Sequence, residues 1–211
     1  MDLIVITPPE NTSNETEMIH QMFQLDLQRL HIRKPNASIE DYHKFIEKID
    51  PSFYPRISIH AHPELIKSFT SIGYHCTGTT LQNPAKMASV FSNAPRIISA
   101  SFHSWKELEN NNHPFEYIFI SPVFNSISKS GYTGNINISD IQATRLKITT
   151  QKKVCPKIIG LGGISETNLH LLFNAGFDGV AAIGSIWLMP NPVKQFILLK
   201  NCLSILKEKK P

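Results

Sequence analysis

Two glycine-containing turns in the last third of the chain have the residue types needed to bind a phosphate group. One apolar run, residues 158–161, stops at a Gly-Gly pair, and a second, residues 179–183, stops at Gly-Ser. Glycine has no side chain, so the oxygens of an anion can approach backbone N–H groups at such turns. The alternative is two ordinary connections between strands and helices, in which glycine is common. The residues predicted to contact phosphate are Gly162, Gly163, Ile183, Gly184 and Ser185.

A second set of polar residues follows the other apolar runs, is rich in histidine and contains neither Asp nor Glu. Its members are His31, Arg33, His60, His62, His75, Ser101 and His103. Imidazole titrates near neutral pH, so one of these rings can serve as acid and base at working pH. His103 is the favoured candidate, because it follows an apolar run and precedes a serine-capped helix. The missing carboxylates argue against a magnesium site.

His60 and His62 offer the alternative of a zinc site, because residues two apart face the same side of a strand. Pro63 ends the extended run at once and no carboxylate joins the pair, so no metal site is predicted. His75 is either a hydrogen-bonded core side chain or a functional one. The three cysteines are widely spaced, which indicates a reducing compartment such as the cytoplasm and neither a disulfide framework nor a zinc site.

Apolar runs and helical patterns alternate eight times along the chain, and this alternation predicts how the polar residues are positioned. Strands are expected at 3–7, 27–32, 56–59, 74–76, 97–101, 117–121, 157–161 and 179–183. Helices are expected at 15–25, 38–49, 63–70, 84–91, 104–109, 139–149, 165–175 and 192–207, with Ser165 favoured over Asn168 as the start of the seventh.

Eight such units predict an α/β fold, a (β/α)8 TIM barrel formed by residues 1–211 as a single domain. An open doubly wound sheet is the alternative. The pattern for the fourth helix is weak, and without that helix the chain would not contain eight strand–helix units. In a barrel, functional side chains follow the strands, and phosphate binds after strands 7 and 8.

Composition limits the expected partners to small anionic molecules. The net charge is +4, and the lysines are scattered apart from the terminal run Lys207–Lys210, which does not indicate nucleic-acid binding. No stretch of 18 apolar residues is present, so no membrane span is predicted. The first ten residues lack a basic region and are expected to form a strand, not a signal peptide.

The segment SPVFNSISKSGYTG, residues 121–134, is long for a loop between a strand and a helix. Long loops in compact domains are often lids or binding loops. Its serine hydroxyls and Lys129 are expected to close over a phosphate. The alternative is a disordered surface loop that binds no ligand.

Several segments together resemble the thiamine phosphate synthase family, which includes the related thiazole tautomerases. They are SFHSWKE, SPVFNSISK, IGLGGISETN and AGFDGVAAIGSI, and the likeness extends from LHIRK onward. The resemblance implies a thiamine-biosynthesis enzyme that binds thiazole phosphate, with a homodimer as its possible assembly. It places Ser126, Ile127 and Ser128 beside the thiazole phosphate, together with the glycine turns. It places His31, Arg33, His60, Ser101 and Lys129 around a pyrimidine diphosphate or a substrate carboxylate.

The chain departs from the synthase pattern where the magnesium aspartates should be. The Asn-Asp pair after the third strand is His60-Ala61, and the second aspartate falls at Thr80. Metal stabilisation of a leaving pyrophosphate is worth several kcal/mol. The resemblance therefore favours the tautomerase branch, with His103 as the acid/base and no cofactor. A synthase that uses magnesium is the alternative, and a non-catalytic phosphate-ligand binding protein is the third possibility.

Overall fold

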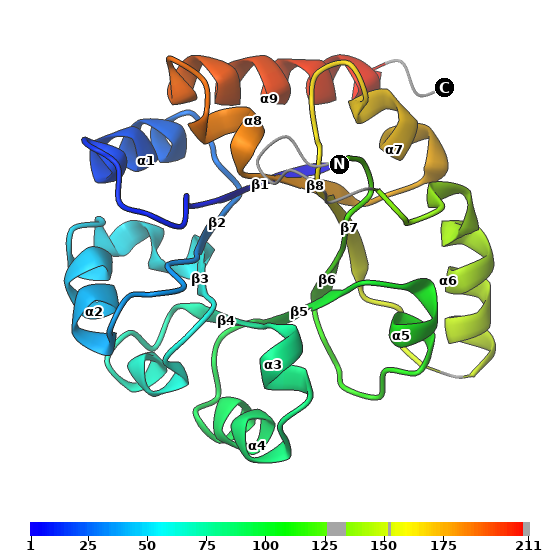
Figure 1. Cartoon of the computed structure of the whole chain (residues 1–211), viewed down its shortest axis with the longest axis horizontal. Helices are drawn as coiled ribbons and strands as arrows, with labels where there is room; N and C mark the ends of the chain where they lie inside the picture. Colours follow the sequence, from blue (N-terminus) through cyan, green and yellow to red (C-terminus); the bar gives the residue numbers. More distant parts are fainter. Residues whose placement is uncertain (126–133, 152, 209–211) are drawn as a thin grey trace.

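Eight short apolar runs form the strands of a closed parallel barrel with helices around it (Figure 1). The computed structural model describes residues 1–125, 134–151 and 153–208. Each strand pairs with the next along the chain, and the last pairs with the first. The strands are β1 (Asp2–Ile6), β2 (Arg29–Ile32), β3 (Ile57–Ile59), β4 (Gly73–Cys76), β5 (Ile98–Phe102), β6 (Tyr117–Ile120), β7 (Lys157–Leu161) and β8 (Gly179–Ala182). The predicted (β/α)8 barrel is confirmed.

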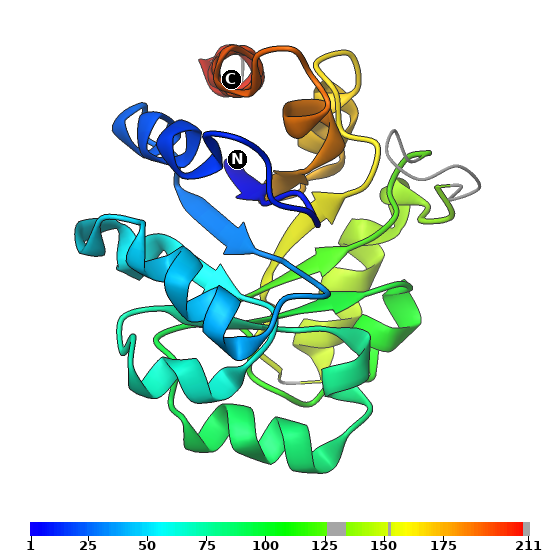
Figure 2. The same cartoon turned by 60° about the vertical axis from the view of Figure 1, so that its left-hand side comes forward.

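The helices cover the outside of the barrel, and α9 packs against α1 outside the seam between β1 and β8 (Figure 2). No helix in the described ranges is long and apolar enough to cross a membrane. The α-helices are α1 (Glu15–Gln24), α2 (Ile39–Glu47), α3 (Gly78–Leu81), α4 (Pro84–Ser92), α5 (Trp105–Glu109), α6 (Ile141–Thr150), α7 (Leu169–Ala175), α8 (Gly184–Trp187) and α9 (Pro192–Glu208). The 3₁₀ helices are η1 (Pro51–Arg56), η2 (Pro63–Lys67) and η3 (Ile138–Asp140).

Two predicted helices differ from the structure. The helix expected at 63–70 is the short 3₁₀ turn η2, and the Ser68 N–H donates to the Leu65 carbonyl three residues back. The seventh helix has its N-cap at Asn168 and not at Ser165. The Asn168 side chain is used outside the helix: its Oδ1 accepts from the Ser165 N–H (2.9 Å) and its Nδ2 donates to the Gly163 carbonyl (2.8 Å). Asn168 therefore ties the start of α7 to the glycine turn after β7.

The interior of the barrel is divided into an apolar half and a polar half. The apolar half comes from β1, β6, β7 and β8 and contains Ile4, Ile6, Tyr117, Phe119, Ile159 and Ala181. The polar half comes from β2 to β5 and contains four fully buried residues, His31, Ser58, His75 and Ser99. Branched aliphatic residues usually fill the inside of such a barrel. The polar half is therefore a feature that packing alone does not require.

A capping box fixes the start of α2, in the segment where the sequence predicts a helix. Ser38 Oγ accepts from the Asp41 N–H (3.1 Å), and Asp41 Oδ2 accepts from the Ser38 N–H (3.1 Å). We expect Ser38→Ala to lower the free energy of unfolding by about 1 kcal/mol, because the Asp41 N–H loses its partner. Urea denaturation measures this loss. The control Ser68→Ala, at an exposed serine that follows η2, should stay within about 0.5 kcal/mol of the wild type.

Candidate active site

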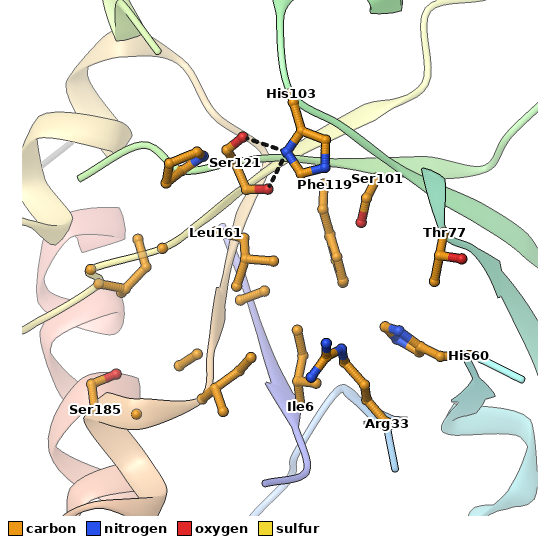
Figure 3. A pocket seen from close by; sticks show the side chains of 18 of the residues that line it. Ile6, Arg33, His60, Thr77, Ser101, His103, Phe119, Ser121, Leu161 and Ser185 are labelled. Atoms are coloured by element: carbon orange, nitrogen blue, oxygen red, sulfur yellow. Dashed lines mark hydrogen bonds between the residues drawn. The ribbon is translucent and has the colours of Figure 1, made fainter. Parts of the chain in front are cut away.

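A pocket of about 330 Å³ lies at the carboxyl ends of the strands, where the fold predicts the functional side chains. The structure brings most of the predicted residues together around it (Figure 3). The predicted residues that line the pocket are Arg33, His60, Ser101, His103, Gly162, Gly163, Ile183, Gly184 and Ser185. Thr77, Phe119 and Ser121 also line it, although the sequence pattern did not single them out.

The two glycine turns lie side by side at one wall of the pocket, because β7 and β8 are paired neighbours. Gly162 and Gly163 have φ values of 103° and 64°, in the left-handed region that favours glycine. The loop after β6 is a second reason why residue 163 must be glycine, since a Cβ at this position would collide with the Asn125 carbonyl oxygen. Both turns therefore border the same pocket, and the first has room only for glycine at residue 163.

Arg33 supplies a positive charge to the pocket. Its backbone is held by Thr7, whose Oγ1 accepts from the Arg33 N–H (2.9 Å) and donates to the Arg33 carbonyl (3.3 Å). None of the ion pairs within the described ranges involves Arg33. The guanidinium is therefore available for an anionic group of a ligand.

His103 lies at the rim of the pocket, and Figure 3 shows His60 and Arg33 across the pocket from it. His103 Nδ1 is 3.0 Å from the Ser121 carbonyl oxygen, and a carbonyl can only accept, so Nδ1–H is the donor. This hydrogen bond fixes the tautomer in which Nε2 carries the lone pair. The Glu107 carboxylate accepts from the His103 N–H (2.8 Å) and holds the backbone at this position. His103 is thus an exposed imidazole whose Nε2 has no hydrogen-bond partner among the residues that the structure describes.

Three histidines pack against one another at the base of the pocket. His31 Nδ1 lies 2.8 Å from His60 Nε2, and the His60 and His75 rings stack with their centroids 4.3 Å apart. The outer nitrogens also have partners: His31 Nε2 is 2.6 Å from the Tyr117 hydroxyl, and His75 Nδ1 is 2.8 Å from Ser99 Oγ. The sequence left the role of His75 open, and the structure makes it a fully buried member of this cluster.

Burial is the main reason why the three rings are uncharged. It holds the pKa of His31 and of His60 well below the usual value and lowers the pKa of His75 to about 3. The nearby positive charges of Arg29 and Arg33 add to this effect. At neutral pH the cluster therefore consists of neutral imidazoles.

Some predicted residues lie elsewhere. His31 is fully buried beneath His60 and is not among the residues that line the pocket. His62 lies apart from the cluster, where its Nε2 is 3.1 Å from the Ala37 carbonyl oxygen. Ser126, Ile127, Ser128 and Lys129 fall outside the residues that the structure describes.

The pocket does not suit the magnesium ion that a synthase would use. No Asp or Glu is among the described residues that line it, and residues 126–133 contain none in their sequence. Thr80, at the position of the second family aspartate, is buried and bonds through Oγ1 to Thr77 Oγ1 (3.3 Å). Magnesium needs hard oxygen ligands, usually carboxylates, and this set of side chains offers none.

Comparison with known proteins supports the fold that carries this pocket. The crystal structure of thiamine phosphate pyrophosphorylase from Bacteroides thetaiotaomicron is 27% identical, with a TM-score of 0.75 over 97% of this chain and 98% of that one. The pyrophosphorylase from Pyrococcus furiosus is 17% identical, with a TM-score of 0.76 over 97% of this chain and 96% of that one, and supports the fold.

A curated thiamine-phosphate synthase from Lysinibacillus sphaericus is 34% identical over 95 residues. The match spans 44% of this chain and 42% of that relative. A synthase from Staphylococcus epidermidis is 26% identical over 67% of this chain and 63% of its own length. The family model for thiamine monophosphate synthase matches residues 3–186, which include all of the barrel strands except the first residue of β1, and both glycine turns. The chain therefore belongs to the thiamine monophosphate synthase family.

Proposed function

We propose that this protein is a tautomerase of the thiazole branch of thiamine biosynthesis, which aromatises a thiazole carboxylate phosphate by moving a proton. The observation that carries the proposal is the position of His103: its Nε2 is unpaired among the described residues, at the rim of a pocket of about 330 Å³ whose described lining contains no carboxylate. A proton transfer of this kind needs an acid/base near neutral pKa and no metal ion.

The geometry supports separate roles for the pocket residues in phosphate binding, carboxylate binding and proton transfer. The phosphate of the substrate lies against the glycine turns after β7 and β8, and its carboxylate pairs with the Arg33 guanidinium. His103 Nε2 accepts a proton from one position of the ring system, and the electron pair of that bond enters the ring. The imidazolium, stabilised by its Nδ1–H bond to Ser121, then returns a proton at the second position.

We expect His103→Gln to lower the rate of aromatisation by about 10²–10⁴-fold, the usual contribution of a positioned acid/base. Substrate affinity should change little, because Arg33 and the glycine turns remain. Proton NMR of the thiazole tautomer with purified enzyme measures the rate. His43→Gln, at an exposed histidine of α2, is the matched control and should retain wild-type activity. Wild-type activity in His103→Gln would overturn the assignment of His103.

The names of the relatives favour a second candidate, thiamine phosphate synthase. The direct comparison supplies pyrimidine methyl diphosphate, thiazole phosphate and magnesium to the purified protein. Thiamine phosphate formed at ordinary enzymatic rates would overturn the tautomerase proposal. Binding of thiazole phosphate with neither activity would replace both with a non-catalytic phosphate-ligand binding protein. We also expect a cytoplasmic homodimer, and cell fractionation and light scattering would check this.

A further inference from the structure

The histidine cluster beneath the pocket has a composition that neither proton transfer nor phosphate binding requires. We infer that His31, His60 and His75 form a binding site for a first-row divalent cation of borderline softness, with Zn²⁺ as the expected occupant. This inference does not depend on the thiazole substrate.

The positions of the ring nitrogens carry the inference. The three residues come from β2, the end of β3 and β4, which are adjacent strands, and one ligand atom from each lies within 4.8 Å of the others. Zinc–nitrogen bonds are about 2.0–2.1 Å long, so tetrahedral ligand nitrogens lie about 3.4 Å apart. The 2.8 Å distance from His31 Nδ1 to His60 Nε2 must open slightly, and the His75 ring must move inward. Both changes require the imidazole rings to rotate from the positions that they have without a metal.

Hydrogen bonds already orient two of the rings as ligands. His31 Nε2–H can donate to the Tyr117 hydroxyl oxygen, which lies 3.3 Å from Ser58 Oγ, and His75 Nδ1–H can donate to Ser99 Oγ. In these tautomers His31 Nδ1 and His75 Nε2 carry the lone pairs that would bind the ion. Metal-bound histidines are typically held in this way through the other ring nitrogen.

Cation binding rearranges two hydrogen bonds and releases no proton from the three histidines. Without a metal, a single proton is shared between His31 Nδ1 and His60 Nε2. On binding, His60 takes the tautomer with its proton on Nδ1, which frees Nε2 as a ligand. The Ser101 hydroxyl, 2.8 Å from His75 Nε2, gives up that bond and remains at the wall of the pocket.

The donor set also selects the kind of ion and its coordination. Three neutral imidazoles without a carboxylate suit zinc and disfavour magnesium and calcium. His60 lines the pocket, so a fourth coordination position opens toward it. Three protein ligands and one open position are typical of reactive zinc sites. The positive charge of Arg33 near the cluster favours a water-derived hydroxide or a ligand carboxylate at this position.

The test uses the full chain, stripped of metal with a chelator, without any substrate. Isothermal titration with ZnCl₂ and visible absorption during titration with Co²⁺ should each show one equivalent bound. We expect Tyr117→Phe, which removes only a hydrogen-bond partner of the ligand His31, to weaken cation binding by about 10–100-fold. We expect His60→Gln and His75→Gln, which each remove a ligand, to weaken it by more than about 100-fold. His62→Gln, two residues beyond His60 but outside the cluster, is the matched control and should bind like the wild type.

Two further measurements keep the result interpretable. Circular dichroism and the urea midpoint of His60→Gln show that the variant is folded, and this half-buried position is the safest of the three to change. A Cys155→Ser, Cys202→Ser variant should bind Co²⁺ unchanged, and its spectrum should lack thiolate charge-transfer bands. Absence of stoichiometric binding, or unchanged binding in His60→Gln, would overturn the site. Neither outcome would affect the tautomerase assay of His103.

Discussion

Glu15→Gln should lower the free energy of unfolding by about 3–5 kcal/mol, the largest effect expected of a single substitution away from the pocket. Both Glu15 carboxylate oxygens accept from Lys34 Nζ at 2.8 Å, and the two residues are 3% and 4% exposed. Lys34 Nζ also donates to the carbonyls of Pro8 (2.9 Å) and Glu10 (3.0 Å). Removal of the carboxylate leaves an ammonium buried without its counterion. Burial already lowers the pKa of Lys34.

Urea denaturation at pH 7.5 measures the loss, and two variants serve as controls. Glu15→Gln combined with Lys34→Met removes both partners and should recover most of the stability, because no buried charge remains. Asp26→Asn breaks the exposed pair with Lys200 and should cost less than about 1 kcal/mol. A loss below about 1 kcal/mol in Glu15→Gln would contradict the prediction. The Glu15–Lys34 ion pair joins the start of α1 to the residue that follows Arg33. Its loss should therefore loosen the backbone next to Arg33 and also weaken phosphate-ligand binding.

Mild acid should unfold the metal-free protein, because the three buried histidines must be neutral in the folded state. Their pKa values lie below the usual 6.5 when folded and return to it on unfolding, so the unfolded chain binds more protons below pH 6.5. Their contribution to stability is therefore complete above pH 6.5 and is lost as the pH falls toward the folded value, about 3 for His75. Each histidine that is neutral in the folded state and protonated in the unfolded chain lowers the free energy of unfolding by about 1.4 kcal/mol per pH unit in this window.

The three rings titrate as one coupled cluster, and together they should remove about 3–4 kcal/mol for each unit below pH 6.5. His60 borders the pocket, so solvent screens it more than the other two. Urea titrations between pH 7.5 and 5, with a chelator present, measure the slope. His75→Phe should make the slope shallower by about a third, while His43→Gln should leave it unchanged. A stability that is independent of pH across this range would contradict the neutral cluster.

The sequence was sufficient for the fold and for much of the site, because both depend on local patterns. Apolar runs that alternate with helical spacing specify the barrel, and the barrel alone places Gly163, Gly184 and His103 at one mouth. The serine caps of α2 and α5 were also predictable, since Ser38 and Ser104 accept bonds from the N–H groups three residues on. These inferences need no knowledge of long-range contacts.

The histidine cluster could not be predicted in the same way, because it depends on strand register. His31 is the register partner of Ser58 on β3, and His75 is the register partner of Ser99 on β5. Only this register brings the rings to the same position along the barrel axis. His60 and His62, which are close in sequence and are not predicted as a metal site, lie apart in the structure, since His62 has a left-handed backbone (φ 55°) and turns away. The start of α7 was missed for a different reason: serine is a favoured N-cap, but here the Asn168 side chain accepts from the Ser165 N–H and donates to the Gly163 carbonyl, so the helix begins after Asn168.

The seam between β1 and β8 has a consequence for synthesis on the ribosome. β1 is among the first segments made, yet one of its two partners, β8, lies about 180 residues later, and the Trp187 indole N–H bonds to the Ile6 carbonyl across the same junction (2.8 Å). Until that late segment emerges, the nascent sheet has two exposed edges, which favour intermolecular pairing. Truncation before residue 179 should therefore produce chains that depend on chaperones and aggregate.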